Sequence, residues 1–450
     1  MPETITAWLE TVQEQIRWKR ARPVLIQELA RHLEDQREEF LKEGKSPEEA
    51  ERLAVRDMGD PVSAGTELDA VHRPRPQWGL LALTLALAAA GAVLRAVFHD
   101  QPGSPAILTG KILVSLGLGT AALLGMYFLD VSRLVRHARA VYIAVLAAGV
   151  LGLRAFPHAT HPAYYAGYAA LLFPVAYTLW FYSFRGKGWT GLFHSIAGGV
   201  PLALICAQTP SAAALLTLLS AGLIMTLWAA WRDWFGTGRG RALCAVLGIT
   251  SGILIRLFYR GYFSAIRVRL QTALHPELDR QGRGFTGWML RTFWEDVLPL
   301  GQLGSEASAG VNAGIRVGWR TRPVDFSSDF LPASMAVAWG WIPLLLLVAA
   351  LTVLLLWLLV KGLRQSYLPG RLTVVAVVLT LGFQTLLSTA LNFGFVLFAA
   401  SLPLVVGNLQ TVMDMALIGL ALSVFRGDSA AREKPPLQQR KRLRIRFEYQ

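Results

Sequence analysis

Residues 332–360 read PASMAVAWGWIPLLLLVAALTVLLLWLLV and contain no charged side chain. A helix of about 20 apolar residues is long enough to cross the hydrocarbon core of a bilayer. Comparable runs recur, and we place spans near 78–98, 107–129, 139–156, 163–184, 190–208, 211–231, 242–264, 332–360, 372–394 and 396–425. A chain with 53% hydrophobic and 16% charged residues is also too apolar for an ordinary soluble domain. The sequence therefore predicts an all-α, polytopic membrane protein with about ten transmembrane helices.

The positive charge of the chain, +14 at pH 7, is concentrated between the spans and in the tail. Lys and Arg occur in the connections 130–139, 184–189, 232–241 and 361–371, and are absent from 99–106, 157–162, 209–210 and the turn near 395. Cytoplasmic loops carry such an excess, so the alternation predicts a multi-pass protein of the cell membrane with both termini in the cytoplasm. This distribution fits membrane orientation better than a face that binds nucleic acid.

A small soluble domain precedes the spans. Apolar residues repeat at helical spacing from Ile5 to Ile16 and again from Leu25 to Phe40. We expect a cytoplasmic helical prefix domain over residues 1–75, and a transmembrane domain over residues 76–426. That transmembrane domain includes a large extracytoplasmic loop at 265–331, where such length usually indicates function or disorder. A basic cytoplasmic tail follows over 427–450, and its charge fits either contact with anionic membrane lipid or a purely topogenic role.

Basic residues inside the predicted spans are functional candidates, because a charge within a bilayer is costly. The four considered further are Lys111, Arg154, Arg256 and Arg260. Snorkelling to the outer headgroups explains Arg154 and Arg260 equally well and is also open to Lys111, but Arg256 lies deeper. The bias of these cations to the outer half predicts an anionic ligand such as a lipid phosphate.

Sequence signals for a metal site are missing. Cys206 and Cys244 lie in apolar stretches without metal-ligand spacing, and nothing near His158 and His161 completes a site. We therefore predict no metal site and no certain cofactor.

Several motifs then point to a family. The most specific is the loop segment Arg269-Leu270 with Leu274–Asp279 and Gly282–Phe285. Further matches are Lys111 with Gly119 and Asp130, Ser327-Ser328-Asp329-Phe330 with Gly340, Phe383-Gln384, Gly394 and Leu402-Pro403-Leu404. With these motifs the chain resembles the FtsW/RodA/SpoVE (SEDS) family over nearly its whole length. Its first domain is similar to the helical prefix that precedes permease-like and SEDS modules.

The chain also departs from the family at three places. Val337 and Ala338 stand where the family has paired glutamates. Val406-Gly407-Asn408-Leu409-Gln410 replaces a Ser-Tyr-Gly-Gly-Ser motif, and Gln208-Thr209-Pro210 replaces Gln-Pro-Asp. These departures weaken the inference that this chain has the activity of the family. Descent from the family is the safer inference.

The resemblance implies a peptidoglycan glycosyltransferase that polymerises lipid II with a class B penicillin-binding protein as partner. Such a reaction needs a carboxylate to take the proton from the attacking hydroxyl, and we assign Asp329 to this role. The structural alternative is that Ser328 and Asp329 cap the eighth span. Asp325 is a nearby competitor, but it lacks the preceding Ser or Thr.

The leaving lipid pyrophosphate needs cations, for which Lys111, Arg256 and Arg269 are candidates and Arg260 a weaker one. Glu277 and Asp279 match the loop signature, either as substrate contacts or as local braces of the loop. A divalent cation near these acidic residues is compatible with the chemistry, although no ligand set can be named.

Two other functions stay open. A catalytically degenerate relative would bind lipid-linked precursor or a partner and regulate envelope assembly, which the missing glutamates favour. A small-molecule transporter would place convergent polar groups at mid-membrane, for which Asn408 and Arg256 give the hints.

Overall fold

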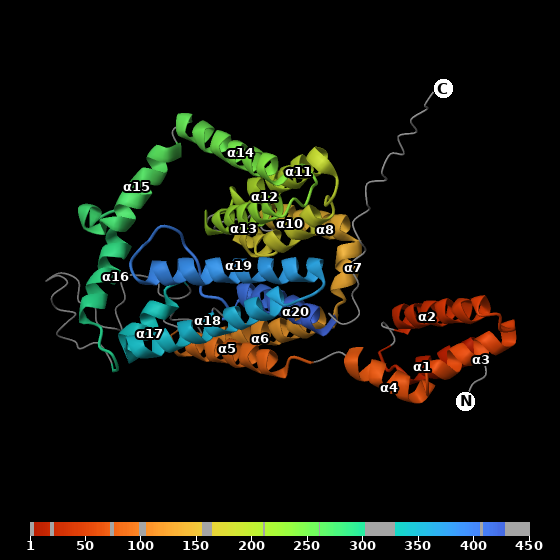
Figure 1. The fold of residues 1–450 in the computed structure, drawn as a ribbon. Helices are drawn as coiled ribbons and strands as arrows, with labels where there is room; N and C mark the ends of the chain where they lie inside the picture. The colour runs from red at the N-terminus through yellow and green to blue at the C-terminus, as the bar shows by residue number, and fades with distance from the viewer. Residues whose placement is uncertain are drawn as a thin grey trace, which may run out of the picture. The chain divides into compact units, whose positions relative to one another are not determined.

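The computed structural model describes residues 4–18, 22–72, 76–98, 105–154, 164–209, 212–260, 262–301, 329–405 and 408–427. Within these ranges the regular structure is helical (Figure 1). The chain divides into two compact units. The first contains the described residues up to Gln77 and the end of the last helix from Phe425, and the second contains the described residues from Trp78 to Val424.

The first unit is a four-helix domain: α1 (Ile5–Gln15), α2 (Arg22–Lys42), α3 (Pro47–Asp57) and α4 (Pro61–His72). Side-chain caps start α1, α3 and α4, because the hydroxyl of Thr4 accepts from Ala7 N, that of Ser46 accepts from Glu49 N, and the carboxylate of Asp60 accepts from Ser63 N. The core is built around Trp8, whose indole Nε1 also donates to the carbonyl of Gly59 at 2.9 Å.

The second unit is an all-helical bundle. Its helices are α5 (Trp78–Val97), α6 (Pro105–Phe128), α7 (Val131–Arg136), α8 (Ala138–Arg154), α9 (Tyr164–Ala170), α10 (Phe173–Tyr182), α11 (Gly188–Ala197), α12 (Gly199–Cys206), α13 (Ala212–Trp231), α14 (Arg239–Tyr259), α15 (Tyr262–Leu274), the 3-10 helix η1 (Pro276–Asp279), α16 (Phe285–Asp296), α17 (Leu331–Trp339), α18 (Trp341–Leu363), α19 (Leu368–Asn392) and α20 (Leu409–Gly427).

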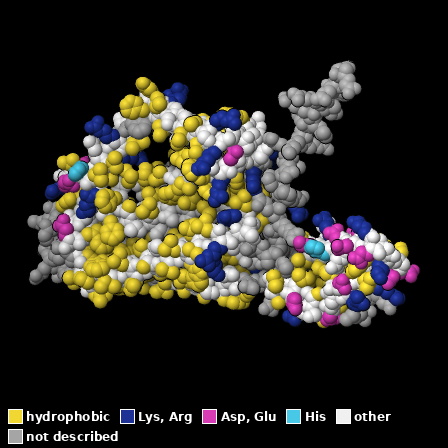
Figure 2. Space-filling view, in the orientation of Figure 1, with side chains coloured by type: hydrophobic (Ala, Val, Ile, Leu, Met, Phe, Trp, Pro, Cys, Tyr) yellow, Lys and Arg dark blue, Asp and Glu magenta, His cyan; other side chains and the backbone are white. Residues whose placement is uncertain are grey.

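Seven helical stretches of the described residues are long and apolar enough to cross a membrane. They are Trp78–Val97, Gly110–Phe128, Gly188–Cys206, Ala213–Trp231, Trp341–Leu363, Leu368–Asn392 and Leu409–Arg426. Figure 2 shows hydrophobic side chains spread over the outer face of this bundle, as a lipid-facing surface requires. The predicted all-α, multi-pass membrane architecture is confirmed.

The predicted span 332–360 is not one helix, because the chain breaks at Gly340 into α17 and α18. Gly340 has a φ of 96°, a left-handed conformation that favours glycine. Just after it, the backbone N–H groups of Trp341 and Ile342 donate to the carbonyls of Leu298 and Pro299 at 3.1 and 3.2 Å. The segment that follows α16 therefore satisfies the backbone groups that the break exposes.

The predicted span 396–425 also begins later than expected, since α20 starts at Leu409 and the described residues 393–405 form turns and bends. The buried carboxylate of Asp414 in α20 accepts from the backbone N–H of Leu404 at 3.1 Å, where Leu404 has a φ of 64°. Irregular backbone at membrane depth is tolerated where protein buries it or where it lines a cavity. We call the described residues 393–405 the re-entrant segment.

The predicted loop 265–331 contains three helices in its described part: α15, η1 and α16. α16 is held to the bundle by Met289, Leu290 and Phe293, which are buried together with Ala333 of α17. The segment predicted as a large loop is thus partly helical, because these apolar residues lie at helical spacing and pack against α17. Residues 302–328 lie outside the described ranges.

Candidate functional site

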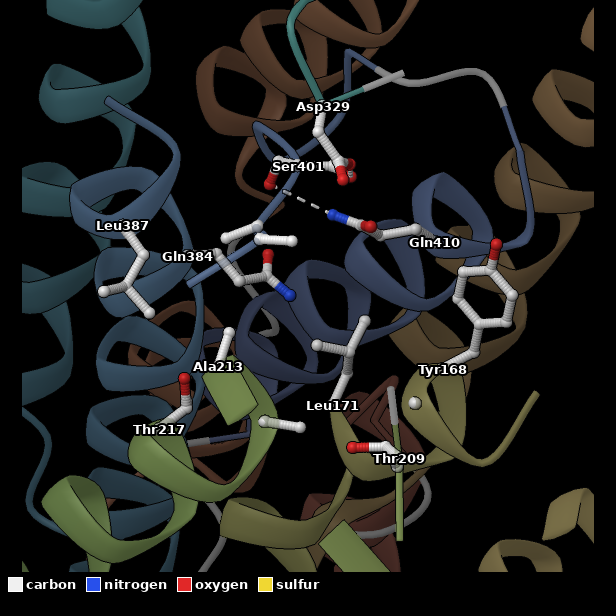
Figure 3. Close-up of a pocket in the computed structure, with 14 residues that line it drawn as sticks. Tyr168, Leu171, Thr209, Ala213, Thr217, Asp329, Gln384, Leu387, Ser401 and Gln410 are labelled. Carbon is white, nitrogen blue, oxygen red and sulfur yellow. Dashed lines mark hydrogen bonds between the residues drawn. The ribbon is translucent and has the colours of Figure 1, made fainter. Parts of the chain in front are cut away.

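Asp329 lies directly before α17 and lines a cavity of about 250 Å³ (Figure 3). The walls come from α9, the α12–α13 connection, α13, α19, the re-entrant segment and the start of α20. The lining residues are Gly167, Tyr168, Leu171, Thr209, Ala213, Ala214, Thr217, Asp329, Gln384, Leu387, Ala399, Ala400, Ser401 and Gln410. Of the two helix breaks described above, the re-entrant segment contributes Ala399, Ala400 and Ser401 to the wall beside the predicted catalytic carboxylate.

The Asp329 side chain does not cap α17. The N-cap residue is Phe330, without a side-chain cap. Instead, Asn392 at the end of α19 accepts from the backbone N–H of Ala333 at 3.0 Å through Oδ1. Its Nδ2 donates to the backbone carbonyl of Asp329 at 2.9 Å. The capping interpretation is therefore wrong for Asp329, and its carboxylate is left for other partners. Ser328 and Asp325 lie outside the described residues.

A hydrogen-bonded frame holds this carboxylate at the cavity. Ser401 of the re-entrant segment donates its hydroxyl proton to Asp329 Oδ1. The backbone carbonyl of Ser401 accepts from Gln410 Nε2 at 3.2 Å, which Figure 3 shows as the dashed line. Gln410 is fixed in turn, since its backbone N–H donates to Asn408 Oδ1 at 2.8 Å. A half-buried carboxylate oriented in this way is suited to accept a proton from a bound hydroxyl group.

The predicted cations lie elsewhere. Lys111 is exposed on α6, Arg256 is exposed near the end of α14, and Arg260 is the exposed C-cap of α14. Arg269 is exposed on α15. Of the residues that the structure describes, none that lines the cavity is a Lys, Arg or His. The structure therefore does not bring these four cations into the cavity with Asp329.

Glu277 and Asp279 lie on η1, also outside the cavity, and are exposed. Asp279 Oδ2 accepts from the backbone N–H of Arg283 at 2.9 Å, and Glu277 Oε1 lies 3.0 Å from His275 Nδ1. A backbone hydrogen bond, followed by the His275 ring, lowers the pKa of Glu277. These contacts are the local bracing that the sequence allowed as an alternative.

Metal-binding groups do not gather in the parts of the chain described here: no three His, Cys, Asp or Glu side chains come together. His158 and His161 fall outside those parts, and Arg154 is the exposed last residue of α8.

Sequence reasoning missed Asn392 and Ser401, and it noted Gln410 only as part of a departure from the family. One signal was present, because a polar residue within or beside an apolar span is costly and indicates a partner. Asn392 ends a run of apolar residues in α19 and is 1% exposed. The identity of its partner, however, depends on tertiary contacts.

Comparison with known proteins finds similar solved structures. No protein-family model matches the chain, and no curated protein matches its sequence. A chain from a peptidoglycan synthase complex that coordinates polymerization and crosslinking is similar in structure, with 20% identity, a TM-score of 0.57, and coverage of 78% of this chain and 98% of that chain.

The Thermus thermophilus rod shape determining protein RodA is also similar. It has 19% identity and a TM-score of 0.50, and the match covers 78% of this chain and 97% of RodA. A RodA variant with one aspartate replaced by alanine gives 18% identity, a TM-score of 0.50, and coverage of 78% and 98%. At these identities the likeness establishes architecture, and it agrees with the motifs noted above. This multi-pass membrane protein has the fold of RodA, and with it the fold of the FtsW/RodA/SpoVE family.

Proposed function

We propose that this protein is a peptidoglycan glycosyltransferase that polymerises lipid II, with Asp329 as the general base. The observation that carries the proposal is the position of the Asp329 carboxylate. Asn392 caps α17 in place of Asp329, Ser401 donates a hydrogen bond to the Asp329 carboxylate, and this carboxylate lines a cavity. The RodA fold and the loop motif at residues 269–285 support the same assignment.

The reaction joins one sugar hydroxyl to the anomeric carbon of a second lipid-linked sugar. As the new C–O bond forms, the bond to the lipid pyrophosphate breaks, and the hydroxyl proton passes to Asp329. The departing pyrophosphate is stabilised by cations. Lys111, Arg256 and Arg269, with Arg260 as a weaker candidate, keep this role in the proposal, and they act from outside the cavity.

The cellular setting follows from the orientation that the basic connections predict. The protein lies in the cell membrane with both termini in the cytoplasm, so that Asp329 faces the extracytoplasmic side, where the polymer grows. Its partner is a class B penicillin-binding protein that cross-links the product. The process served is cell elongation, division or sporulation.

The test is polymerisation of lipid II by the purified full-length protein, alone and with its penicillin-binding partner. Wild type is expected to form glycan strands, and Asp329→Asn to lose about 100-fold or more of the rate, because a general base contributes about that much. Asp325→Asn is the matched control and should retain activity. A wild-type protein that binds lipid II but forms no strands under either condition would contradict the enzyme proposal.

A degenerate, regulatory protein is the second candidate, and one observation favours it. Val337 and Ala338 occupy half-buried positions on α17 where the family has its paired glutamates. If those glutamates are indispensable to catalysis, the Asp329 cavity would bind precursor without turning it over. The binding-without-product result described above is the outcome expected of this candidate.

A further inference from the structure

The interior of the cavity contains a polar side chain that the fold leaves without a partner. Gln384 of α19 is 6% exposed and lines the cavity. Neither its Oε1 nor its Nε2 has a hydrogen-bond partner among the described residues. Its amide lies near the Asp414 carboxyl, whose Oδ1 is likewise buried without a hydrogen-bond partner among the described residues. A buried amide left in this state destabilises the protein, so its retention needs an explanation.

Figure 3 places the Gln384 amide well inside the cavity, below Ser401 and Gln410 and facing the side of Leu171 and Ala213. An amide offers one oxygen that accepts and one nitrogen that donates two protons. A bound molecule that enters the cavity is therefore the group able to satisfy it.

The rest of the wall determines the kind of molecule. Tyr168, Thr209 and Thr217 contribute hydroxyl-bearing side chains, and Gln410 contributes a second amide. Asp329 is the one ionisable acidic side chain among the described lining residues, and these include no Lys, Arg or His. A phosphate group would meet an anion and find no cation, whereas phosphate sites use Arg, Lys or a cradle of backbone N–H groups.

Resting on the function proposed above, we infer that this cavity is a subsite for an uncharged sugar, whose hydroxyl and acetamido groups are recognised by Gln384. The pyrophosphate of the same lipid stays outside it. The volume agrees, because a cavity of about 250 Å³ is smaller than the roughly 300–1,000 Å³ of pockets that enclose a whole small molecule. The cavity therefore accepts one part of the lipid-linked substrate.

Two ligands that share the lipid pyrophosphate test this division, since lipid II adds to it the disaccharide with its attached peptide. Full-length protein in lipid nanodiscs is titrated with lipid II, which carries the sugars, and with undecaprenyl pyrophosphate, which lacks them. Gln384→Met keeps the side-chain shape and removes both polar ends. It should weaken the binding of lipid II by about tenfold, the loss expected for a buried hydrogen bond to a neutral group, and leave undecaprenyl pyrophosphate unchanged.

Gln365→Met is the matched control. The Gln365 side-chain oxygen is also buried without a partner among the described residues, and its Nε2 donates to the Lys361 carbonyl at 3.2 Å. It lies between α18 and α19 and does not line the cavity. This variant should bind both ligands like wild type.

Folding provides an independent readout. Because Gln384 makes no hydrogen bond within the described chain, Gln384→Met should unfold at the same temperature as wild type or higher. Gln384→Leu repeats the comparison should the methionine variant fold poorly. Phosphatidylglycerol, which carries headgroup hydroxyls without a sugar, is added as a competitor and should not displace lipid II.

The inference is overturned by unchanged lipid II affinity in Gln384→Met, by an equal loss for both ligands, or by displacement by phosphatidylglycerol. Failure of the proposed function is a separate result. In that case wild type forms no glycan strands, while the tenfold difference specific to lipid II still appears and supports the sugar subsite.

Discussion

Asn392 organises the backbone around Asp329. Its amide nitrogen donates to Ser388 O at 2.8 Å and to Asp329 O at 2.9 Å, and its oxygen accepts from Ala333 N at 3.0 Å. The backbone carbonyl of Asn392 also accepts from Trp294 Nε1 at 2.8 Å. One side chain thus links α19 to the first turn of α17, while the main chain at the same position anchors α16. These hydrogen bonds of Asn392 fix the backbone at Asp329, and the carboxylate of Asp329 takes no part in them.

Ser401 is the residue whose removal tests that positioning directly. Ser401→Ala deletes the hydrogen bond to the Asp329 carboxylate and leaves the cavity wall otherwise intact. We expect kcat for strand formation to fall by about tenfold with KM nearly unchanged, because the base loses orientation and the substrate keeps its contacts. Initial rates over a range of lipid II concentrations measure both constants.

Ser220→Ala is the control for Ser401→Ala. The Ser220 hydroxyl donates to the Leu216 carbonyl of its own helix at 2.6 Å and lies outside the cavity. It should leave kcat and KM as in wild type. A Ser401→Ala protein that kept its kcat, or that lost affinity alone, would contradict the positioning role.

Local motifs singled out Asp329, which the structure places at a cavity, but they did not predict which residues contact it. The Ser-Ser-Asp-Phe pattern lies in four consecutive residues, whereas Asn392 and Ser401 reach Asp329 across 63 and 72 residues of sequence. The same local pattern suggested capping by Asp329, because Ser and Asp are frequent N-caps. A cap supplied by a distant helix has no signature in the sequence around α17.

Among the helices, the breaks within apolar runs matter most for the site. Gly340 separates α17 from α18, and the backbone of Pro299 and Leu300 packs where a side chain at Gly340 would lie. A hydropathy window averages over such a position, so a continuous span was predicted. The positive φ and the contact with Pro299 emerge only when α16 and its following segment are in place.

Gly340→Ala should destabilise the protein by about 1–3 kcal/mol or more, because alanine meets both an unfavourable φ and a backbone contact. Thermal unfolding in detergent is the measurement. Gly382→Ala is the control: Gly382 lies within α19, a methyl group added there would meet no atom within 4 Å, and the change should be neutral or slightly stabilising. Equal melting temperatures for the two variants would contradict this explanation of the break.

Over the whole bundle, the basic connections meet aromatic rings. Arg139 and Lys187 lie over the ring of Phe184 at 5.8 and 4.6 Å, and Arg185 lies over Trp234 at 5.2 Å. Two of these connections are also hydrogen-bonded, since Gly186 N donates to the Trp234 carbonyl at 3.0 Å. Cations above aromatic side chains are typical of a membrane interface.

Composition and charge placement were therefore enough to predict the all-α membrane architecture. They were not enough to place Lys111, Arg256 and Arg269 relative to Asp329. The sequence of a single span shows which residues are charged, but it does not show which residues of different spans share a cavity. The structure separates these cations from Asp329, whose described surroundings are hydroxyls, amides and small apolar groups. Convergence on a cavity is a property of the assembled helices.

The orientation of the bundle remains a prediction, and it can be tested by labelling intact cells with a membrane-impermeant maleimide. In a background with Cys206→Ala and Cys244→Ala, Leu278→Cys should react, because this side chain is 80% exposed on the segment predicted to lie outside. Glu43→Cys in the first unit and Arg364→Cys after α18 are exposed in the structure, yet should react only after permeabilisation. The reverse pattern would contradict the orientation and place η1 on the cytoplasmic side. In that case Asp329 would face away from any extracytoplasmic polymer. The helix α18 carries this argument, because it begins beside the segment that follows α16 and ends at Leu363, next to Arg364.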